Sequence, residues 1–382
     1  MLMHTMHKTT RPTRPTQQLR ALLLLAAALA AAVHAAAAVK TETVAHGLVN
    51  PWSLAFLPDG RMLVTERPGR LRIVSAAGLV GPAVQGVPAV AAKGQCGLHD
   101  VLLDLRFAEN NTLYLSYAEP GAGGNSLAVL RARLVGQALA DVKVIFRQLP
   151  KVDSPAHCGG KLVFGQDGNL FITLGDRFAR KDDAQTLANH LGKIVRIAPD
   201  GSVPAGNPFI KTPGAMPEIW SLGHRNVQGA ALHPATGELW ATEHGPQGGD
   251  ELNLVLGGRN FGWPLVTYGR NYGTGTRIGE DGPKPGFEPP LRHWVPVSVA
   301  PSGLAFLTSE RYPGWKGNLF VGTLRAEALL RLELDGHRVV KEERLLTNMK
   351  ERIRDVRQGP DGYLYLLTDN ADGRVLRLLP RP

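Results

Sequence analysis

A short stretch of the sequence, QDGNLFIT at Gln166–Thr173, joins a turn to a run of apolar residues. An Asp-Gly pair ahead of aromatic and β-branched residues is typical of a β-hairpin. The same combination of turn and apolar run occurs six times along the chain. The other five copies are PDGRMLVT (Pro58–Thr65), ENNTLYLS (Glu109–Ser116), ATGELWAT (Ala235–Thr242), WKGNLFVG (Trp315–Gly322) and PDGYLYLL (Pro360–Leu367).

A second apolar stretch lies before each copy, so the repeated unit is strand, tight turn, strand. The copies follow one another at intervals of roughly 45 to 80 residues. We therefore predict an all-β fold, a six-bladed β-propeller of four-stranded antiparallel sheets. A β-sandwich with many hairpins is the alternative, but it gives no reason for one unit to recur over the whole chain. Almost no segment after Ala38 has a sustained helical period with capping residues.

The first 38 residues differ from the rest of the chain. Four basic residues precede the apolar run ALLLLAAALAAAV, and small residues follow it, an order typical of a secretory signal peptide. The run is shorter than the about 20 residues of a membrane-spanning helix, so an uncleaved anchor is the less favoured alternative. We expect residues 1–38 to be a signal peptide and residues 39–382 to form a single β-propeller domain. The expected location is the periplasm, without stable membrane insertion of the mature chain.

The charge of the chain restricts the class of partner. The formal net charge is +10, and the first 38 residues contribute four positive charges and no negative one, which leaves +6 on the remainder. The basic residues are scattered rather than gathered in blocks, which argues against a nucleic-acid partner. A mild positive excess is compatible with a small anionic ligand bound at one site.

Polar residues stand just before the first strand of most repeated units. In a propeller the first strands line a central channel and their leading ends share one mouth, so we expect these side chains to converge. His157 is then the candidate for the centre of a site, and Gly159 and Gly160 would let a flat ligand approach the backbone. The residues of this ring are Asn50, Gln95, His157, Arg225, Asn226, Ser302, Arg352 and Arg354.

Some of these residues also have a purely structural interpretation. A lone histidine such as His157 at a strand start is commonly a hydrogen-bonded structural residue, and Arg352 and Arg354 could belong to a solvated strand edge. The ring as a whole favours binding, because arginines near one point repel one another unless an anion balances them. Guanidinium groups bind carboxylate or phosphate through paired hydrogen bonds.

Longer motifs extend this hypothesis. The chain from about Thr43 to Leu378 resembles the soluble aldose sugar dehydrogenases, dependent on pyrroloquinoline quinone (PQQ), of the glucose/sorbosone dehydrogenase family. The order GHRN, EHGPxGGDE, NFGWP is specific. The resemblance implies a catalytic propeller with PQQ and Ca²⁺ as cofactors, an aldose sugar as substrate and an unidentified electron acceptor. The segments that carry it are NPWSLAFLPDG, GQCGLHDV, HCGGKLVF, LGKIVRI, IWSLGHRNVQG, EHGPQGGDELN, GRNFGWPLVTYGRNY and RIRDVRQGPDGYLYLLTD.

The resemblance implies roles for residues of the ring. His157 matches the catalytic base, and Arg225 matches the arginine beside the reactive carbonyl of PQQ. Gln95 and Asn226 match polar contacts to PQQ. The remaining cofactor-binding matches are Arg352 and Arg354 at the carboxylates and Arg325 where the family often has lysine.

Two positions for Ca²⁺ also follow from the resemblance. The carbonyl groups of Gly245 and Pro246 match ligands of the Ca²⁺ that is bound with PQQ, in keeping with the preference of Ca²⁺ for oxygen. Glu251 and the backbone of Phe261 suggest a second, structural Ca²⁺. The alternative for the EHGPQGGDE segment is a plain acidic surface turn.

The implied reaction is oxidation of an aldose at its anomeric carbon to the lactone. His157, neutral near pH 7, takes the hydroxyl proton as a hydride passes to the quinone, while Ca²⁺ and Arg225 stabilise the growing negative charge. Arg177 stands where some relatives have Gln, and Ala156 stands where the best-known glucose enzymes have Asp, so the preferred sugar stays open.

Two other classes of propeller remain as alternatives. One is a Ca²⁺-dependent lactonase-type hydrolase, which uses acidic metal ligands at the channel, and the other is a binding propeller without a cofactor. A ring dominated by Arg, Gln and Asn favours an anionic organic cofactor over a bare metal ion, which would require several carboxylates.

The two cysteines of the chain, Cys96 and Cys158, directly follow Gln95 and His157. If those two neighbours face one cofactor, the cysteines lie on adjacent blades at the same height and could form a disulfide, which an exported protein permits. The alternative is two unrelated buried thiols, since adjacent blades alone do not guarantee a suitable separation.

Overall fold

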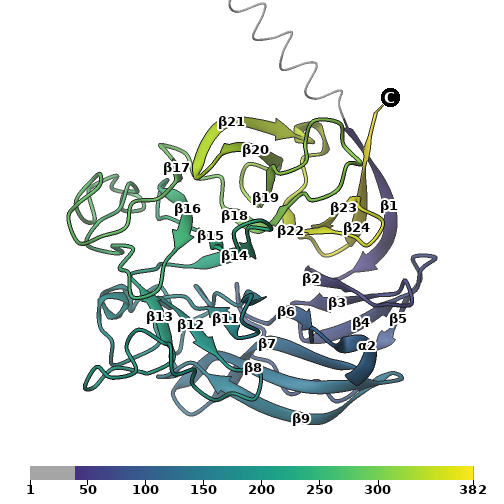
Figure 1. Ribbon diagram of the computed structural model, residues 1–382, viewed down its shortest axis with the longest axis horizontal. Coiled ribbons are helices and arrows are strands. Elements are labelled where there is room, and N and C mark those ends of the chain that lie inside the picture. The colour runs from purple at the N-terminus through teal and green to yellow at the C-terminus, as the bar shows by residue number, and fades with distance from the viewer. Residues whose placement is uncertain (1–38, 382) are drawn as a thin grey trace, which may run out of the picture.

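The computed structural model describes residues 39–381, and the predicted signal peptide at residues 1–38 lies outside them. Figure 1 shows six sheets arranged around a central axis, and each sheet has four strands. The pairing within every sheet is antiparallel. The predicted six-bladed β-propeller is therefore confirmed. Within this described part, no helix is long and apolar enough to cross a membrane.

The first three blades follow one another in sequence. Blade 1 contains β2 (Pro51–Phe56), β3 (Met62–Glu66), β4 (Arg70–Val74) and β5 (Val80–Ala83). Blade 2 contains β6 (Leu98–Leu103), β7 (Thr112–Gly121), β8 (Gly124–Val135) and β9 (Ala138–Arg147). Blade 3 contains β10 (Leu162–Phe164), β11 (Leu170–Thr173), β12 (Lys193–Ile197) and β13 (Ile219–Leu222).

The other three blades complete the ring. Blade 4 contains β14 (Val227–Leu232), β15 (Leu239–Glu243), β16 (Asp250–Val255) and β17 (Arg292–Trp294). Blade 5 contains β18 (Pro301–Phe306), β19 (Leu319–Thr323), β20 (Leu329–Asp335) and β21 (Arg338–Leu345). Blade 6 contains β22 (Ile353–Gln358), β23 (Leu364–Thr368), β24 (Gly373–Pro380) and β1 (Val39–Leu48). The short helices are α2 (Phe107–Asn110), η1 (Lys181–Gln185) and η2 (Thr347–Met349).

Blade 6 joins the two ends of the described chain. β1 is its outermost strand and pairs with β24, with Val39 opposite Pro380 and Leu48 opposite Gly373. The remaining strands of this blade come from the C-terminal end of the chain (Figure 1). The ring is thus closed by hydrogen bonds between strands from opposite ends of the described sequence.

The repeated turn forms as its sequence predicts. At the start of Gln166–Thr173, the backbone N–H of the preceding Gly165 donates to the carbonyl of Asn169 at 2.7 Å, and Gly168 has φ 76°, a conformation that glycine adopts without strain. The apolar residues that follow form β11, and all four of them are buried. The apolar run of each other copy likewise forms the second strand of its blade.

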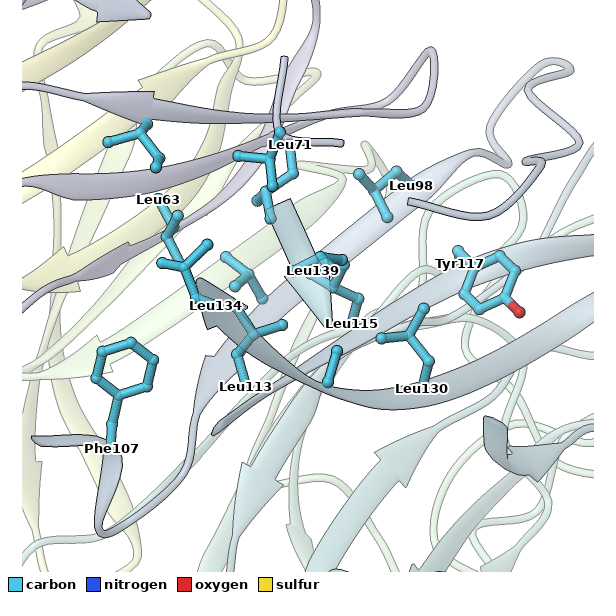
Figure 2. Packing of buried hydrophobic residues seen from close by; sticks show 14 of the residues in the cluster. Leu63, Leu71, Leu98, Phe107, Leu113, Leu115, Tyr117, Leu130, Leu134 and Leu139 are labelled. Atoms are coloured by element: carbon cyan, nitrogen blue, oxygen red, sulfur yellow. The ribbon is translucent and has the colours of Figure 1, made fainter. Parts of the chain in front are cut away.

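The hydrophobic core is divided among the interfaces between neighbouring blades. Figure 2 shows one such cluster, in which Leu63 and Leu71 of blade 1 pack with Leu113, Leu115 and Leu130 of blade 2. Comparable clusters join the other pairs of neighbouring blades. Apolar burial between blades therefore stabilises the ring, and the ends of the inner strands are available for polar groups.

The inner strands are β2, β6, β10, β14, β18 and β22, and each contacts the inner strands of both neighbouring blades. Four charged side chains lie among them. Lys161 Nζ is 2.9 Å from Asp355 Oδ1, and Arg357 binds Asp100 at 2.7 Å and Asp355 at 2.8 Å. We call Asp100, Lys161, Asp355 and Arg357 the channel network, in which two positive charges balance two negative ones.

Candidate functional site

His157 stands just before the inner strand of blade 3 and is held by groups from three loops. Its Nδ1 lies 2.6 Å from Oδ1 of Asp176, in the connection from β11 to β12. Oδ2 of Asp176 in turn accepts a hydrogen bond from Trp263 Nε1 at 2.7 Å. The backbone N–H of His157 donates to Gln95 Oε1 at 2.9 Å. The imidazole ring is therefore fixed in one orientation.

The surroundings of His157 also decide its protonation. Burial lowers its pKa and the positive charge of Arg225 lowers it further, although Asp176 acts in the opposite direction. Burial by itself would raise the pKa of Asp176, but the contact with His157, the charge of Arg225 and the N–H of Phe178 together outweigh it and keep the pKa below its usual range. A carboxylate only accepts hydrogen bonds, so Nδ1 carries the ring proton and Nε2 keeps its lone pair. Among residues 39–381, no group hydrogen-bonds to this Nε2.

Arg225 contacts the EHGPQGGDE segment. Its Nη1 donates to the carbonyl oxygens of His244 at 3.0 Å and Gly245 at 2.6 Å. Its guanidinium carbon lies 5.2 Å from the centre of the Trp263 ring, a cation–π distance. The buried Nε of Arg225 has no hydrogen-bond partner in the described part of the chain. Because an unpartnered buried donor is costly, this group has capacity for an acceptor that the protein does not supply.

A line of hydrogen bonds crosses the mouth from blade 3 to blade 6. The side-chain oxygen of Asn226 accepts from the N–H of Gly159 at 3.3 Å and from Gln228 Nε2 at 3.2 Å. Gln228 Oε1 accepts from Arg354 Nη1 at 3.1 Å, and Arg354 Nη2 donates to Asp369 at 2.7 Å. The structure therefore brings together Asn226 and Arg354, which are far apart in the sequence.

Asp369 is the meeting point of the arginines of blade 6. Arg352 and Arg354 both donate to Oδ2 of Asp369, Arg352 at 3.0 Å. The Arg352 side chain is 46% exposed and that of Arg354 is 8% exposed. Burial opposes ionisation of Asp369, but Arg354 and Arg352 outweigh it and hold the pKa of this carboxyl far below its usual range. Arg67 lies near these groups as well: burial lowers its pKa, the charge of Asp369 opposes this, and the charges of Arg354 and Arg352 add to the lowering. The mouth thus holds a compact basic cluster.

Positive charge exceeds negative charge at this mouth. The buried Nε of Arg354, like that of Arg225, has no partner within the described residues. An anion with several oxygen acceptors would balance the excess and bind the free donors. The charged groups concerned are Arg67, Arg225, Arg352 and Arg354 against Asp176 and Asp369.

One residue of the predicted ring and one cofactor-binding prediction do not join these contacts. Ser302 is fully buried and donates to the carbonyl of Ile353 at 2.6 Å, which is a structural contact between blades 5 and 6. Asn50 does join them, through a long hydrogen bond of 3.4 Å from its Nδ2 to Asp369 Oδ1. Arg325 is exposed, and its side chain makes no hydrogen bond to the described residues. It follows Leu324, whose carbonyl accepts from Arg352, so Arg325 lies at the edge of the site.

The EHGPQGGDE segment is a structured loop rather than a plain acidic surface turn. Asp250 is fully buried, and its carboxylate accepts from the N–H of Gly245 at 2.9 Å and from the N–H of Val299 and Ala300 at 2.7 and 2.8 Å. This carboxylate therefore holds the loop. The carbonyl of Gly245, predicted to bind Ca²⁺, accepts from Arg225 at 2.6 Å and lies beside the basic cluster.

A small cleft lies beside this loop. Glu251 and Phe261 line it, together with Glu243 and Gly245. The cleft has a volume of about 10 Å³, roughly the space of one water molecule or ion. Burial raises the pKa of Glu251 well above its usual value, and the negative charge of Glu243 adds to this effect. Arg225 also lines the cleft, so one guanidinium group faces the two acidic side chains, and a bound cation would balance the second negative charge. Residues 39–381 contain no group of three or more His, Cys, Asp or Glu side chains arranged to hold a metal ion.

Six site residues were missing from the sequence-based prediction: Arg67, Asp176, Gln228, Glu243, Trp263 and Asp369. A signal for the two aspartates was present. In each blade the second strand ends beside the start of the first strand. Asp176 and Asp369 come shortly after the ends of the second strands of blades 3 and 6. Glu66 and Glu243 occupy the same place, and each accepts a backbone N–H at 2.7 Å from the start of its blade. Acidic residues at second-strand ends therefore pair with the leading ends of the first strands.

Cys96 and Cys158 form a disulfide with Cα atoms 5.7 Å apart. Both are buried, and the bridge joins the segment before β6 to the segment before β10. Each cysteine directly follows a residue of the His157–Gln95 contact. The bridge thus holds two sides of the site together.

Comparison with known proteins agrees with this geometry. The profile of the family described as Glucose / Sorbosone dehydrogenase matches residues 48–377, nearly the whole described chain. The chain belongs to the glucose/sorbosone dehydrogenase family. The matched region spans all six blades and includes the residues at the mouth of the channel.

Individual relatives within the glucose/sorbosone dehydrogenase family extend the comparison. The chain is 44% identical over 353 residues to aldose sugar dehydrogenase YliI of Escherichia coli, which covers 91% of this chain and 94% of the relative. A solved glucose dehydrogenase superposes with a TM-score of 0.86 at 49% identity, over 88% of this chain and 99% of that one. The PQQ-bound aldose sugar dehydrogenase of Streptomyces coelicolor superposes with a TM-score of 0.73 at 30% identity, over 90% and 99% of the two chains.

Proposed function

We propose that this protein is a PQQ-dependent dehydrogenase that oxidises aldose sugars at the anomeric carbon to the lactone. The observation that carries the proposal is the placement of a neutral, oriented His157 beside a cluster of arginines with unpartnered donors. The relative from Streptomyces coelicolor binds PQQ, and the relative from Escherichia coli is an aldose sugar dehydrogenase. Both facts support the proposal.

The arginines at the mouth suit PQQ, because they are positively charged and have unpartnered N–H donors, while PQQ is a tricarboxylate. Bound there, PQQ would supply a two-electron acceptor for the hydride from the sugar, and Ca²⁺ would supply a Lewis acid at the quinone carbonyls. Arg354 and Arg352 hold the carboxylates, with Arg325 at the edge of the site, because their guanidinium groups exceed what Asp369 can balance. Gln95 and Asn226 contribute polar contacts from opposite sides.

The chemical task of His157 is to take the proton of the anomeric hydroxyl. Its Nε2 has a free lone pair, and Asp176 stabilises the positive charge that the ring acquires when it accepts the proton. The proton thus moves from the sugar oxygen to Nε2, while the carbon loses a hydride and becomes the lactone carbonyl. Arg225 stabilises negative charge on the oxidant side of the reaction through its free Nε donor.

Two metal positions belong to the proposal. The carbonyls of Gly245 and Pro246 would hold the Ca²⁺ that accompanies PQQ, as the resemblance to the family implies, and the Gly245 carbonyl lies beside Arg225 at the mouth. Glu251 and the carbonyl of Phe261 hold a structural Ca²⁺ in the small cleft, where Glu243 adds a second negative charge.

We also propose that the protein is exported, with residues 1–38 removed as a signal peptide. The order of basic, apolar and small residues supports this, and a disulfide is suited to an oxidising compartment. The mass of the protein recovered from the periplasm tests it, since an intact residue 1–38 segment in that fraction would contradict cleavage.

Reduction of a redox dye by glucose tests the proposed reaction, and the dye takes the place of the unidentified electron acceptor. The protein is assayed after loading with PQQ and Ca²⁺, with PQQ alone, with Ca²⁺ alone and with neither. We expect dye reduction only when PQQ is present, and a higher rate with Ca²⁺. Hydrolysis of a sugar lactone without dye reduction under any loading would replace this proposal with a hydrolase.

A further inference from the structure

The segment directly after Asp176 has an unusual backbone. Arg177 and Phe178 have φ values of 59° and 64°, so two consecutive residues with side chains adopt the left-handed conformation. This conformation is unfavourable for L-residues, and a bulky residue in it is a true outlier. Such strain persists only where surrounding contacts impose it, and it occurs often at functional sites.

Arg177 supplies the contacts that hold this backbone. Its side chain is fully buried, and Nη2 donates to Asn125 Oδ1 at 2.6 Å and to the carbonyl of Ser154. Nη1 lies 3.2 Å from the sulfur of Cys96 and also contacts that of Cys158. The guanidinium group is thus anchored beside the disulfide, and the anchor determines where the next residue points.

Phe178 points to the opposite side, toward the catalytic base. Its backbone N–H donates to Asp176 Oδ1 at 2.8 Å, the oxygen that also binds His157. Its ring lies edge-on to the His157 ring, with the ring centres 5.2 Å apart, while 55% of the residue is exposed. An isolated exposed apolar residue would need no explanation. This one combines exposure, backbone strain and contact with the base.

We propose that Phe178 is the apolar wall of the sugar-binding position beside His157, and that Arg177 is the positioning residue that holds it there. A pyranose ring presents C–H groups on its faces, and an exposed aromatic ring packs against such groups while hydroxyl groups meet polar residues. The substrate class is therefore an aldose in its ring form. This inference rests on the proposed function and adds to it a residue that selects and orients the sugar.

The matched variants Phe178→Ala and Phe178→Gly test the wall. Both remove the ring, but only glycine adopts a positive φ without strain. In the PQQ-loaded enzyme we expect kcat/KM for glucose to fall about 5- to 10-fold in both, as for loss of one aromatic contact. The Kd for PQQ should stay within about twofold of wild type. The melting temperature of the unloaded Phe178→Gly chain should exceed that of Phe178→Ala.

A pH profile separates a role at the base from a merely structural one. Phe178 contributes to the burial that lowers the pKa of His157. The charged and titratable groups around the ring are Arg225 and Arg177, which also lower this pKa, Asp176, which raises it, and the buried His244. Without the ring, the pKa of His157 rises toward its ordinary value. The acid limb of kcat/KM should therefore move to higher pH in both variants.

A double-mutant cycle tests the anchor. If Arg177 acts only through Phe178, the loss in Arg177→Gln/Phe178→Ala equals that in Phe178→Ala alone, whereas independent roles would give additive losses. Leu79→Ala is the control, because Leu79 is 74% exposed in the turn between β4 and β5 and should leave kcat/KM unchanged. Should Arg177→Gln fail to fold, the Phe178 pair still decides the wall.

The outcomes separate this inference from the proposed function. An active wild type and an inactive His157→Ala, together with Phe178 variants within twofold of wild type, would overturn only the inference. Full activity in Phe178→Gly with reduced activity in Phe178→Ala would overturn it as well, since strain rather than loss of the ring would then be responsible. A wild type that reduces no dye after PQQ loading overturns both.

Discussion

The channel of this propeller contains two groups of charged side chains that differ in how their charges are balanced. In the channel network, Lys161 and Arg357 are matched by Asp100 and Asp355 through contacts of 2.7 to 2.9 Å. At the mouth, four arginines face two carboxylates, and two buried guanidinium nitrogens have no partner within residues 39–381. A balanced group is complete without a ligand, whereas the arginines at the mouth have capacity to bind one. The difference indicates a stabilising role for the first group and a binding role for the second.

The largest expected effect is that of His157→Ala at the mouth. Removal of a general base lowers the rate by ~10² to 10⁴-fold, while the basic cluster that binds PQQ stays intact. Dye reduction and PQQ titration of the same preparation measure the two properties separately. A variant that keeps more than about a tenth of the wild-type rate would remove His157 from the base role.

Lys161→Met breaks the balance of the channel network. It leaves two buried carboxylates with one cation, and loss of one partner of a buried pair costs about 3 to 5 kcal/mol in free energy of unfolding. Denaturant unfolding measures the change. Lys316→Met is the matched control, because the Lys316–Glu310 pair is exposed and contributes about 0 to 1 kcal/mol. Equal changes in the two variants would contradict a stabilising role for the network.

Arg354→Ala and Arg352→Ala should weaken PQQ binding to different degrees. The Arg354 side chain is 8% exposed and that of Arg352 is 46% exposed, so solvent screens the second more strongly. We expect the Kd for PQQ to rise about 10- to 100-fold for Arg354→Ala and up to about fivefold for Arg352→Ala. Titration of the unloaded protein with PQQ gives both values, and an unchanged Kd for Arg354→Ala would separate that residue from the binding site.

The smallest expected effect is a displacement of the pH profile. Burial and Arg225 lower the pKa of His157 below 6.5, so the base stays neutral into mildly acidic solution. Activity should be lost only as the pH falls through this lowered pKa. The acid limb of kcat/KM should therefore lie below pH 6.5, and Arg225→Gln, which removes one cause of the shift, should move the limb upward. An acid limb above pH 6.5 would contradict this account.

The fold could be predicted because it repeats. One hairpin such as Gln166–Thr173 is weak evidence, but six copies of the same unit along the whole chain leave few architectures other than one with six similar parts. The predicted location of the site rests on the same repeat, since equivalent positions before each inner strand share one mouth. The structure links Asn226 to Arg354 through Gln228, and Asn226 also accepts from Gly159, two residues after His157.

The partners of these residues were harder to predict, because one is a repeated acidic position that shows only when the blades are aligned and another comes from a loop outside the repeat. Asp176 orients His157 from the connection after β11. Trp263 donates to Asp176 from the long connection between β16 and β17. Loop paths of this kind depend on contacts that a single sequence does not display. Arg325 shows the converse, since its position in the sequence suggested a ligand contact, while its side chain is exposed at the edge of the mouth.

The pairing of β1 with β24 has a consequence for the time course of folding. β1 is the first described strand to leave the ribosome and β24 is the last, yet the two are neighbours in blade 6. Contacts between distant parts of a chain form slowly, because the entropy of closing the loop must be overcome first. Until synthesis is complete, β1 has an unpaired edge that can associate with another chain. Ring closure is therefore the late step that ends the period in which the nascent protein is prone to aggregate.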